Sequence, residues 1–238
     1  MKKTRTVLIL GASSDIGVQV VKKFLNTGWK VFAHCNSNEE IFKSSYFFNK
    51  KIEIFKTDLG KINQLNKLIK KIKKIKIDSF INMVGYLNNQ SFSRSTINTK
   101  IKSLTINVIS PIEILKNIVN NMRLNKFGRI VNISSIGVKF GGSEFTYDYS
   151  FSKHALEYIP YFIKQINKFN ILTNNLRIGV VNTKLLRKVK GKKISSRVKL
   201  IPMKRMGNIE EITNMIYFLG TEQNSYISCQ TISISGGE

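Results

Sequence analysis

Hydrophobic residues fall into two alternating patterns along the chain. The apolar run TVLIL (6–10) predicts a buried strand. The next stretch, 15–26, carries apolar residues from Ile16 to Phe24 at helical spacing, which predicts a helix that ends at Gly28. The same patterns predict further strands over 29–35, 51–58, 77–85, 128–135, 170–181 and 230–235 and further helices over 67–76, 97–124, 149–168 and 209–219.

This alternation predicts an α/β fold: one Rossmann-like, doubly wound parallel sheet of about seven strands, with helices on both faces. No repeat and no Pro/Gly/Ser-rich linker interrupts the pattern, so we expect a single domain over 1–238. Ligands of such sheets bind beyond the carboxyl ends of the strands. Those ends are predicted at 11–17, 34–38, 58, 82–85, 134–135 and 179–183.

The formal net charge of +25 indicates either an anionic partner or a lysine bias on solvated faces. In KLIKKIKKIK (67–76) the apolar residues Leu68, Ile69, Ile72 and Ile75 share one helix face, so the lysines there are expected to face water. No aromatic-interleaved basic motif accompanies the charge, so we do not expect nucleic-acid binding as the main role.

The two cysteines, Cys35 and Cys229, are far apart and show no metal-ligand spacing. We therefore expect no metal site and a reduced, cytoplasmic setting. No stretch approaches the roughly 18 apolar residues that a membrane span needs, so no span is expected.

The segment GASSDIG (11–17) carries the first candidate chemistry. Gly11 ends the predicted strand and Gly17 lies in the first turn of the helix, with small residues between them. Such a turn brings backbone amides close to a pyrophosphate at the start of a helix. The same residues are also typical of an ordinary capped turn, and the segment alone does not decide between these interpretations.

Three further features are each ambiguous alone. Tyr149 and Lys153 in YSFSK share one helix face, where an ammonium would lower the pKa of the phenol and make it an acid or base. Ser135 in NISS ends a strand, where it can bond a substrate carbonyl or simply open a loop. Pro111 deprives the carbonyl of Asn107 of its helical partner, which frees it to hold a water or merely kinks the helix.

These features together, in this order, resemble the short-chain dehydrogenase/reductase family over essentially the whole chain. The resemblance implies that Tyr149 is the acid/base, Ser135 orients the carbonyl, and Lys153 lowers the Tyr149 pKa and holds the nicotinamide ribose. Asn107 would hold a water in the proton relay. Ser134 and Tyr147 are rivals that match the family pattern less well.

The resemblance also implies a cofactor site, with Asp58 at the adenine and Thr183 at the nicotinamide carboxamide. Its expected residues are Gly11, Ser13, Ser14, Asp15, Ile16, Gly17, Asn36, Ser37, Asp58, Leu59, Asn82, Gly85, Tyr149, Lys153, Gly179 and Thr183. Leu10, Asp15, Met83 and Ile178 depart from the family pattern. We predict that the Asp15 side chain points away from the pyrophosphate, because two anions in contact repel.

The residues HCNSN (34–38) follow the second strand without an acid until Glu39. An acid at this place would bind the ribose hydroxyls of NAD and repel a 2′-phosphate. We therefore predict NADP as the cofactor, with NAD as the alternative.

The basic segment 184–205 lies where family members carry a lid over the substrate, and we call it the lid segment. Its charge indicates an anionic substrate, such as an acyl thioester on an acidic carrier protein, or the general lysine bias. The ending from Ile201 to Gly237 resembles the 3-oxoacyl-carrier-protein reductase branch. We thus expect NAD(P)H-dependent reduction of a 3-oxoacyl thioester, as in fatty acid biosynthesis.

Two other functions stay open. One is a sugar or polyol dehydrogenase/reductase of the same family, and the other is a non-enzymatic protein that binds dinucleotide or nucleic acid. Family members usually assemble as homotetramers through helices that correspond to 97–124 and 149–168 and through the C-terminal segment, so the same assembly is expected here.

Overall fold

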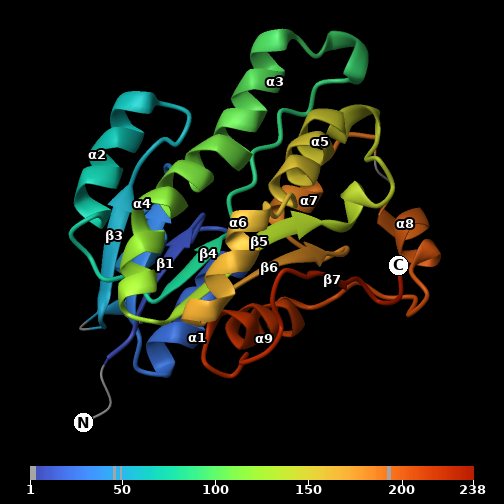
Figure 1. The fold of residues 1–238 in the computed structure, drawn as a ribbon. Helices are drawn as coiled ribbons and strands as arrows, with labels where there is room; N and C mark the ends of the chain where they lie inside the picture. The colour runs from blue at the N-terminus through green and yellow to red at the C-terminus, as the bar shows by residue number, and fades with distance from the viewer. Residues whose placement is uncertain (1–3, 45–46, 49, 192–193) are drawn as a thin grey trace.

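In a computed structural model, which describes residues 4–44, 47–48, 50–191 and 194–238, a parallel sheet forms the centre of the protein (Figure 1). Its seven strands have the order β3-β2-β1-β4-β5-β6-β7. They are β1 (Thr6–Leu10), β2 (Lys30–Cys35), β3 (Ile52–Lys56), β4 (Ser79–Asn82), β5 (Gly128–Ser135), β6 (Ile171–Ile178) and β7 (Thr231–Ile234). This arrangement confirms the predicted doubly wound sheet, and its order reverses between β1 and β4.

Helices cover both faces of the sheet (Figure 1). On one face, α1 (Asp15–Asn26) packs beside α9 (Ile209–Gly220). On the other lie α2 (Ile62–Ile72), α4 (Ser110–Leu124) and α5 (Tyr147–Leu156). Shorter or more peripheral elements are α3 (Ile97–Leu104), α6 (Tyr161–Gln165), α7 (Lys184–Arg187), α8 (Ile194–Leu200), and the 3-10 helices η1 (Glu40–Lys43), η3 (Phe92–Arg94), η5 (Ile136–Val138), η6 (Glu144–Thr146) and η7 (Ile166–Phe169).

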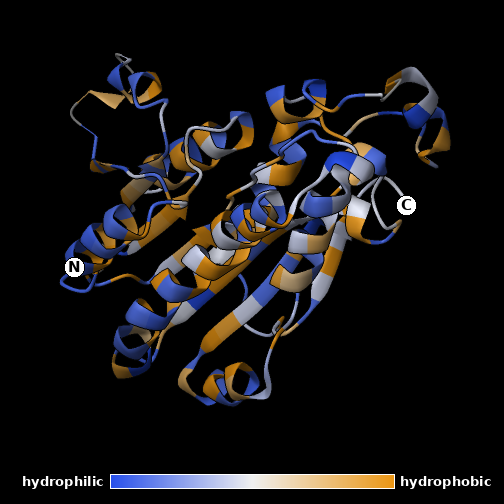
Figure 2. Ribbon diagram, turned by 90° about the horizontal axis from the view of Figure 1, so that it is seen from above, coloured by the Kyte–Doolittle hydropathy of each residue, from blue (hydrophilic) through white to orange (hydrophobic). Residues whose placement is uncertain are grey.

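The sheet separates two hydrophobic layers. Val21 and Phe24 of α1 pack with Ile216 of α9 in one layer. Ile114 and Ile118 of α4 pack with strand and α2 residues in the other. Figure 2 shows hydrophobic residues concentrated on the strands and hydrophilic residues on the outer sides of the helices. The core thus holds the strands in place from both faces of the sheet.

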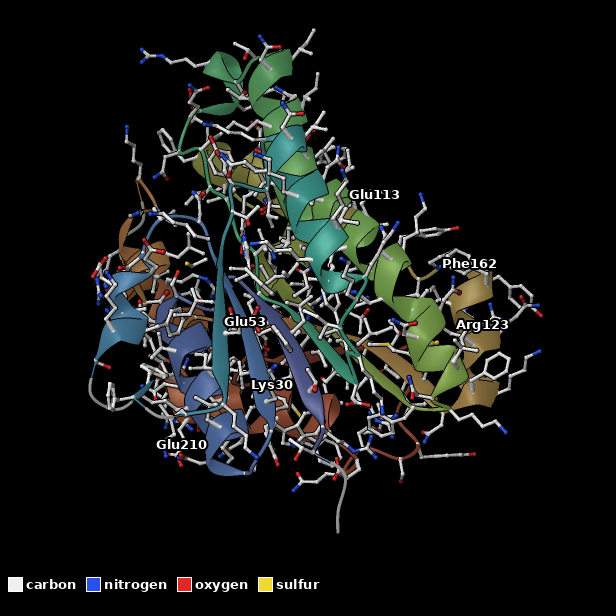
Figure 3. All side chains as sticks on the ribbon, turned by 90° about the vertical axis from the view of Figure 1, so that its left-hand side faces the viewer. Lys30, Glu53, Glu113, Arg123, Phe162 and Glu210 are labelled. Atoms are coloured by element: carbon white, nitrogen blue, oxygen red, sulfur yellow. The ribbon has the colours of Figure 1, made fainter. Side chains whose placement is uncertain are left out.

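The edge strand β3 carries charged side chains at Glu53 and Lys56. Lys30 on β2 and Glu53 on β3 lie on neighbouring strands (Figure 3), with the ammonium nitrogen 3.8 Å from the carboxylate. Charged side chains at a sheet edge discourage pairing with another chain.

The predicted helix over 97–124 is interrupted. A π-helical segment, Thr105–Ile109, separates α3 from α4, and Pro111 opens α4. The N–H of Ser110 bonds to the carbonyl of Thr105, the wider turn of a π-helix. Pro111 has no N–H to give to the carbonyl of Asn107, so the chain rearranges at that turn.

The predicted helix over 149–168 is also wrong in its length. It is divided into α5, α6 and η7, and Pro160 directly precedes α6. The residue before a proline is disfavoured in helical conformation, so α5 ends early. In the described part of the chain, no helix is both long and apolar enough to cross a membrane.

Candidate active site

A cavity of about 970 Å³ opens at the carboxyl ends of the strands, across the point where the strand order reverses. Most of the residues predicted for the site line this cavity. They are Gly11, Ser13, Ser14, Asp15, Ile16, Asn36, Ser37, Asp58, Leu59, Gly85, Ser135, Tyr149, Lys153, Gly179 and Thr183. Gly17, Asn82 and Asn107 are buried behind the lining. The fold therefore brings the glycine-rich turn and the Tyr149 helix to one space.

The turn over 11–17 is built from close backbone contacts. Gly11 has a φ of +72°, and a Cβ there would lie 2.9 Å from the carbonyl oxygen of Met83. A Cβ on Gly17 would lie 2.6 Å from the carbonyl oxygen of Ala12. The Ser14 hydroxyl accepts the Gly17 N–H at 3.1 Å and so caps α1. The turn is therefore capped, and it also presents the start of α1 to the cavity.

His34 is a site residue that the sequence analysis did not assign beyond its place in HCNSN. Its Nδ1 accepts the Gly11 N–H at 3.2 Å, and its Nε2 donates to the Thr57 carbonyl at 2.9 Å. Burial lowers the pKa of His34 to about 4, so the ring is neutral at neutral pH. It joins the ends of β1, β2 and β3. The signal for it was a lone polar residue in the apolar run VFAHC (31–35).

Lys153 is buried at the base of the cavity. Its ammonium donates to the carbonyls of Val84 at 2.6 Å and Ile133 at 2.5 Å. Desolvation lowers the pKa of Lys153 to about 7, against the opposing attraction of Glu157. An ammonium has three donors, so two are engaged by the sheet and one is left.

Tyr149 differs from the expectation for its acidity. The Lys153 nitrogen lies 5.8 Å from the centre of the Tyr149 ring, because it is bonded to the strand carbonyls. Loss of water around the phenol raises the pKa of Tyr149 to about 12. The prediction that Lys153 lowers this pKa is thus wrong for this structure: burial is the larger effect.

The two pairs of rivals differ in their surroundings. The Ser134 hydroxyl donates to Glu157 at 2.5 Å, whereas the Ser135 hydroxyl accepts the Gly137 N–H at 3.1 Å and can still donate its hydrogen. Tyr147 is outside the cavity lining and packs with Phe92 and Phe151. Ser135 and Tyr149 are therefore the members that remain available to a ligand.

Asn107 acts behind the cavity wall. Its carboxamide accepts the Tyr86 N–H at 2.7 Å and donates to the Tyr86 carbonyl at 3.0 Å. It also donates to the Ser152 hydroxyl at 2.8 Å, which donates to the Tyr149 carbonyl at 2.8 Å. The side chain thus ties the strand end after β4 to the helix that carries Tyr149. That its carbonyl holds a water stays a prediction.

A ladder of asparagines crosses the sheet beneath the site. Asn82, Asn132 and Asn175 are paired in register on β4, β5 and β6. Their carboxamides are joined by hydrogen bonds of 3.4 and 3.2 Å. This use of Asn82 differs from the expected contact with the cofactor, because its side chain is wholly buried in the sheet.

Both ends of this asparagine ladder connect to α5. Asn175 donates to the carbonyl of Glu157, next to the end of α5, at 2.8 Å. Asn82 accepts the N–H of Val84 at 3.3 Å, and the carbonyl of Val84 accepts from Lys153. A continuous set of hydrogen bonds therefore runs from Lys153 through the sheet and back to α5.

The end of β2 is lined by Asn36, Ser37 and Asn38, which are exposed. Glu39, the first acid after them, is bonded to Lys56 at 2.8 Å and is outside the cavity lining. The carboxylate of Glu39 thus forms an ion pair with a lysine of β3 and does not face the cavity.

The cavity wall carries more basic than acidic side chains. The basic ones are Lys153, Lys184, Lys188, Lys190 and Arg197, and the acidic ones are Asp15, Asp58 and Glu144. Most of the basic residues belong to the lid segment. Among the described residues, no cluster of His, Cys, Asp and Glu has the size of a metal site.

Comparison with known proteins supplies the family. The family model described as "Enoyl-(Acyl carrier protein) reductase" matches residues 11–238. The chain belongs to the short-chain dehydrogenase/reductase family. This confirms the resemblance seen in the motifs around Gly11, Asn107, Ser135 and Tyr149.

Individual members of this family match over almost the whole chain. A 3-oxoacyl-[acyl-carrier-protein] reductase from Buchnera aphidicola subsp. Schizaphis graminum is 27% identical over 98% of this chain and 96% of its own. An acetoacetyl-CoA reductase from Shinella zoogloeoides is 27% identical over 99% of this chain and 98% of its own. The NADPH-dependent reductase YwfH, involved in bacilysin biosynthesis, is 25% identical, with a TM-score of 0.87 over 99% of this chain and 98% of its own.

Proposed function

We propose that this short-chain dehydrogenase/reductase uses NADPH to reduce a ketone to a secondary alcohol, and that the ketone belongs to a 3-oxoacyl thioester. One observation carries the proposal: Ser135, Tyr149 and Lys153 line the same cavity as the glycine-rich turn at Gly11. The relatives reported above are reductases by name, among them reductases of 3-oxoacyl and acetoacetyl thioesters.

The residues fit a dinucleotide. The backbone at Gly11 comes so close to Met83 that only a glycine fits, and the start of α1 is turned to the cavity. A helix start attracts a pyrophosphate. When bound, NADPH supplies the hydride that forms the new C–H bond of the alcohol.

Tyr149 supplies the proton that completes the alcohol. With a pKa of about 12 in the free protein, its phenol carries a proton at neutral pH and is ready to donate in the direction of reduction. Ser135 donates a hydrogen bond to the substrate carbonyl and polarises it. Lys153 binds the nicotinamide ribose with the donor that the sheet carbonyls leave. Asn107 holds the Tyr149 helix in place.

The choice of NADP rests on the end of β2. Neutral residues, Asn36 to Asn38, line the cavity there, and the carboxylate of Glu39 is neutralised by Lys56. Nothing at this position repels a 2′-phosphate as an acid would. Asp58 and Leu59 line the same cavity and would contact the adenine.

The substrate class rests on charge. Lys184, Lys188 and Lys190 of the lid segment line the cavity, and they favour an anionic substrate such as a thioester of coenzyme A or of an acidic carrier protein. The same chain, with one catalytic domain, would then serve fatty acid biosynthesis.

We also propose a homotetramer in the cytoplasm. Ile109, Ile112 and Phe151 are about half exposed along the helices expected at the interface. Phe162 on α6 is exposed on the same side as Arg123 of α4 (Figure 3). If these residues form a contiguous apolar patch, that patch is typical of an association surface. The unpaired cysteines fit a reducing compartment.

The test is NADPH oxidation with acetoacetyl-CoA and with an acetoacetyl carrier protein, beside a panel of sugar and polyol ketones. Turnover of a thioester that is lost in Tyr149→Phe supports the proposal. Turnover of sugars only, or none at high enzyme concentration, contradicts it. Parallel assays with NADH test the cofactor, and light scattering tests the tetramer.

A further inference from the structure

The turn over 11–17 makes a contact that a glycine at position 15 could not make. One carboxylate oxygen of Asp15 accepts the backbone N–H of Lys184 at 2.6 Å, across 169 residues of sequence. The contact joins the first residue of α1 to the first residue of α7. Both residues line the cavity, on its dinucleotide side and at the start of the lid segment.

The backbone bond matters more than the nearby ion pair. The Lys184 ammonium lies 3.9 Å from Asp15, but its side chain is 69% exposed, so water screens the attraction. The Asp15 side chain is 23% exposed, and its bond to the amide is short and charge-assisted. Because the carboxylate bonds to the backbone N–H, it can hold the chain at position 184 independently of the side chain there.

The bond between Asp15 and the Lys184 N–H lies next to a residue of the proposed cofactor site. Thr183, which immediately precedes Lys184, lines the cavity, and its hydroxyl caps α7 by accepting the Leu186 N–H. A tie at Lys184 thus fixes the place where the chain turns from β6 into α7. Asp15 makes both side-chain polar contacts that the described residues show between the turn over 11–17 and Lys184.

We propose that Asp15 is a positioning residue that fastens α7, and with it Thr183, to the dinucleotide turn. The bond is independent of which substrate the protein reduces. In the competing view, the carboxylate occupies the place of the cofactor phosphates and its removal strengthens cofactor binding.

The test compares Asp15→Gly, Asp15→Asn and Lys184→Gln. Asp15→Gly removes the acceptor. Asp15→Asn keeps an acceptor oxygen but loses the charge, and so also controls for the loss of a carboxylate in the first turn of α1. Lys184→Gln keeps the backbone bond and removes only the ion pair.

The first measurement is trypsin cleavage of the native protein after Lys184, Arg187 and Lys188, followed by mass spectrometry. Asp15→Gly should be cut about tenfold faster than wild type, as expected for the loss of a charge-assisted bond. Asp15→Asn should be cut within about threefold of the wild-type rate at all three bonds. Lys184→Gln, which trypsin cannot cut after residue 184, should be cut within about threefold of the wild-type rate after Arg187 and Lys188. Equal cleavage of Asp15→Gly and wild type would overturn the proposal.

The second measurement is NADP affinity from thermal shifts. A fastened α7 predicts weaker binding in Asp15→Gly and nearly unchanged binding in Asp15→Asn. Tighter binding in both variants with unchanged cleavage supports the competing view and refutes ours. Cleavage needs no activity, so a protein that does not reduce thioesters can still pass or fail this test.

Discussion

The two sides of the cavity are built from different materials. On the dinucleotide side, at the ends of β1 and β2, backbone groups and small residues such as Gly11 and Ser14 form the wall. On the proposed catalytic side, at the ends of β4 to β6, side chains such as Tyr149 and Lys153 form it, and the buried Asn107 lies behind them. The first side is defined by backbone conformation, and the second by side chains that bond to one another.

This difference explains where the chain departs from its family pattern. Asp15 replaces a glycine, yet Ser14 still caps α1 and Gly11 keeps its close approach to Met83. A backbone cradle tolerates a new side chain that points elsewhere. The buried network around Lys153 has no such freedom, since each polar group lost there leaves another without a partner.

The sharpest way to break the catalytic side is Tyr149→Phe. We expect kcat to fall by about 10² to 10⁴, because the proton donor is removed. NADP affinity and thermal stability should stay near those of wild type, since the phenol makes no hydrogen bond to the residues that the structure describes. Steady-state kinetics measures kcat, an NADP titration measures the affinity, and a thermal melt measures the stability. A fully active variant would show that Tyr149 is not the proton donor.

On the dinucleotide side, a substitution that disturbs the backbone conformation should weaken cofactor binding. Gly11→Ala places a Cβ 2.9 Å from the Met83 carbonyl at a φ of +72°. Gly28→Ala is the matched control, with a φ of +84° and no atom within 4 Å. Both should lose about 1–2 kcal/mol of unfolding free energy from the left-handed conformation. Only Gly11→Ala should also weaken NADP binding, by about tenfold, in equilibrium titration.

The burial of Lys153 predicts a pH dependence of the free energy of unfolding. The pKa of Lys153 is about 7 in the folded protein, against 10.5 for an ordinary lysine. Between these two pH values the unfolded chain therefore binds more protons than the folded protein. Wild-type stability should therefore rise with pH over this window relative to Lys153→Met, by at most about 1.4 kcal/mol per pH unit. Urea unfolding from pH 7 to 10 measures the difference. Parallel curves for the two proteins would contradict the lowered pKa of the buried lysine.

The asparagine ladder should give the smallest effect on activity. Asn175→Ala breaks its link to α5, whereas Asn174→Ala on the same strand removes a buried bond to Ile227 outside the ladder. Both should cost about 1–3 kcal/mol of stability. Only Asn175→Ala should also lower kcat, by about threefold, and shift its pH profile, because Lys153 is positioned through the ladder. Equal kinetics in the two variants would reduce the ladder to a structural role.

Local pattern determined much of this protein. The helix over 15–26 and the strand over 128–135 have the predicted bounds, because apolar periodicity reports which face of an element is buried. The spacing of Tyr149 and Lys153, together with Ser135 and Asn107, was enough to identify the family. Helix lengths at Pro111 and Pro160 were harder, since a proline permits either a kink or an end.

Tertiary structure decided the pKa values and the long-range hydrogen bonds of the site residues. Sequence spacing suggested that Lys153 would acidify Tyr149, but strand carbonyls capture the ammonium and desolvation raises the phenol pKa. His34 beneath Gly11, and Asp15 bonded to Lys184, join residues that are distant in the sequence. Periodicity and spacing report neighbours along the chain. Solvation and long-range hydrogen bonds exist only once the strands are assembled, so those properties could be known only from the folded protein.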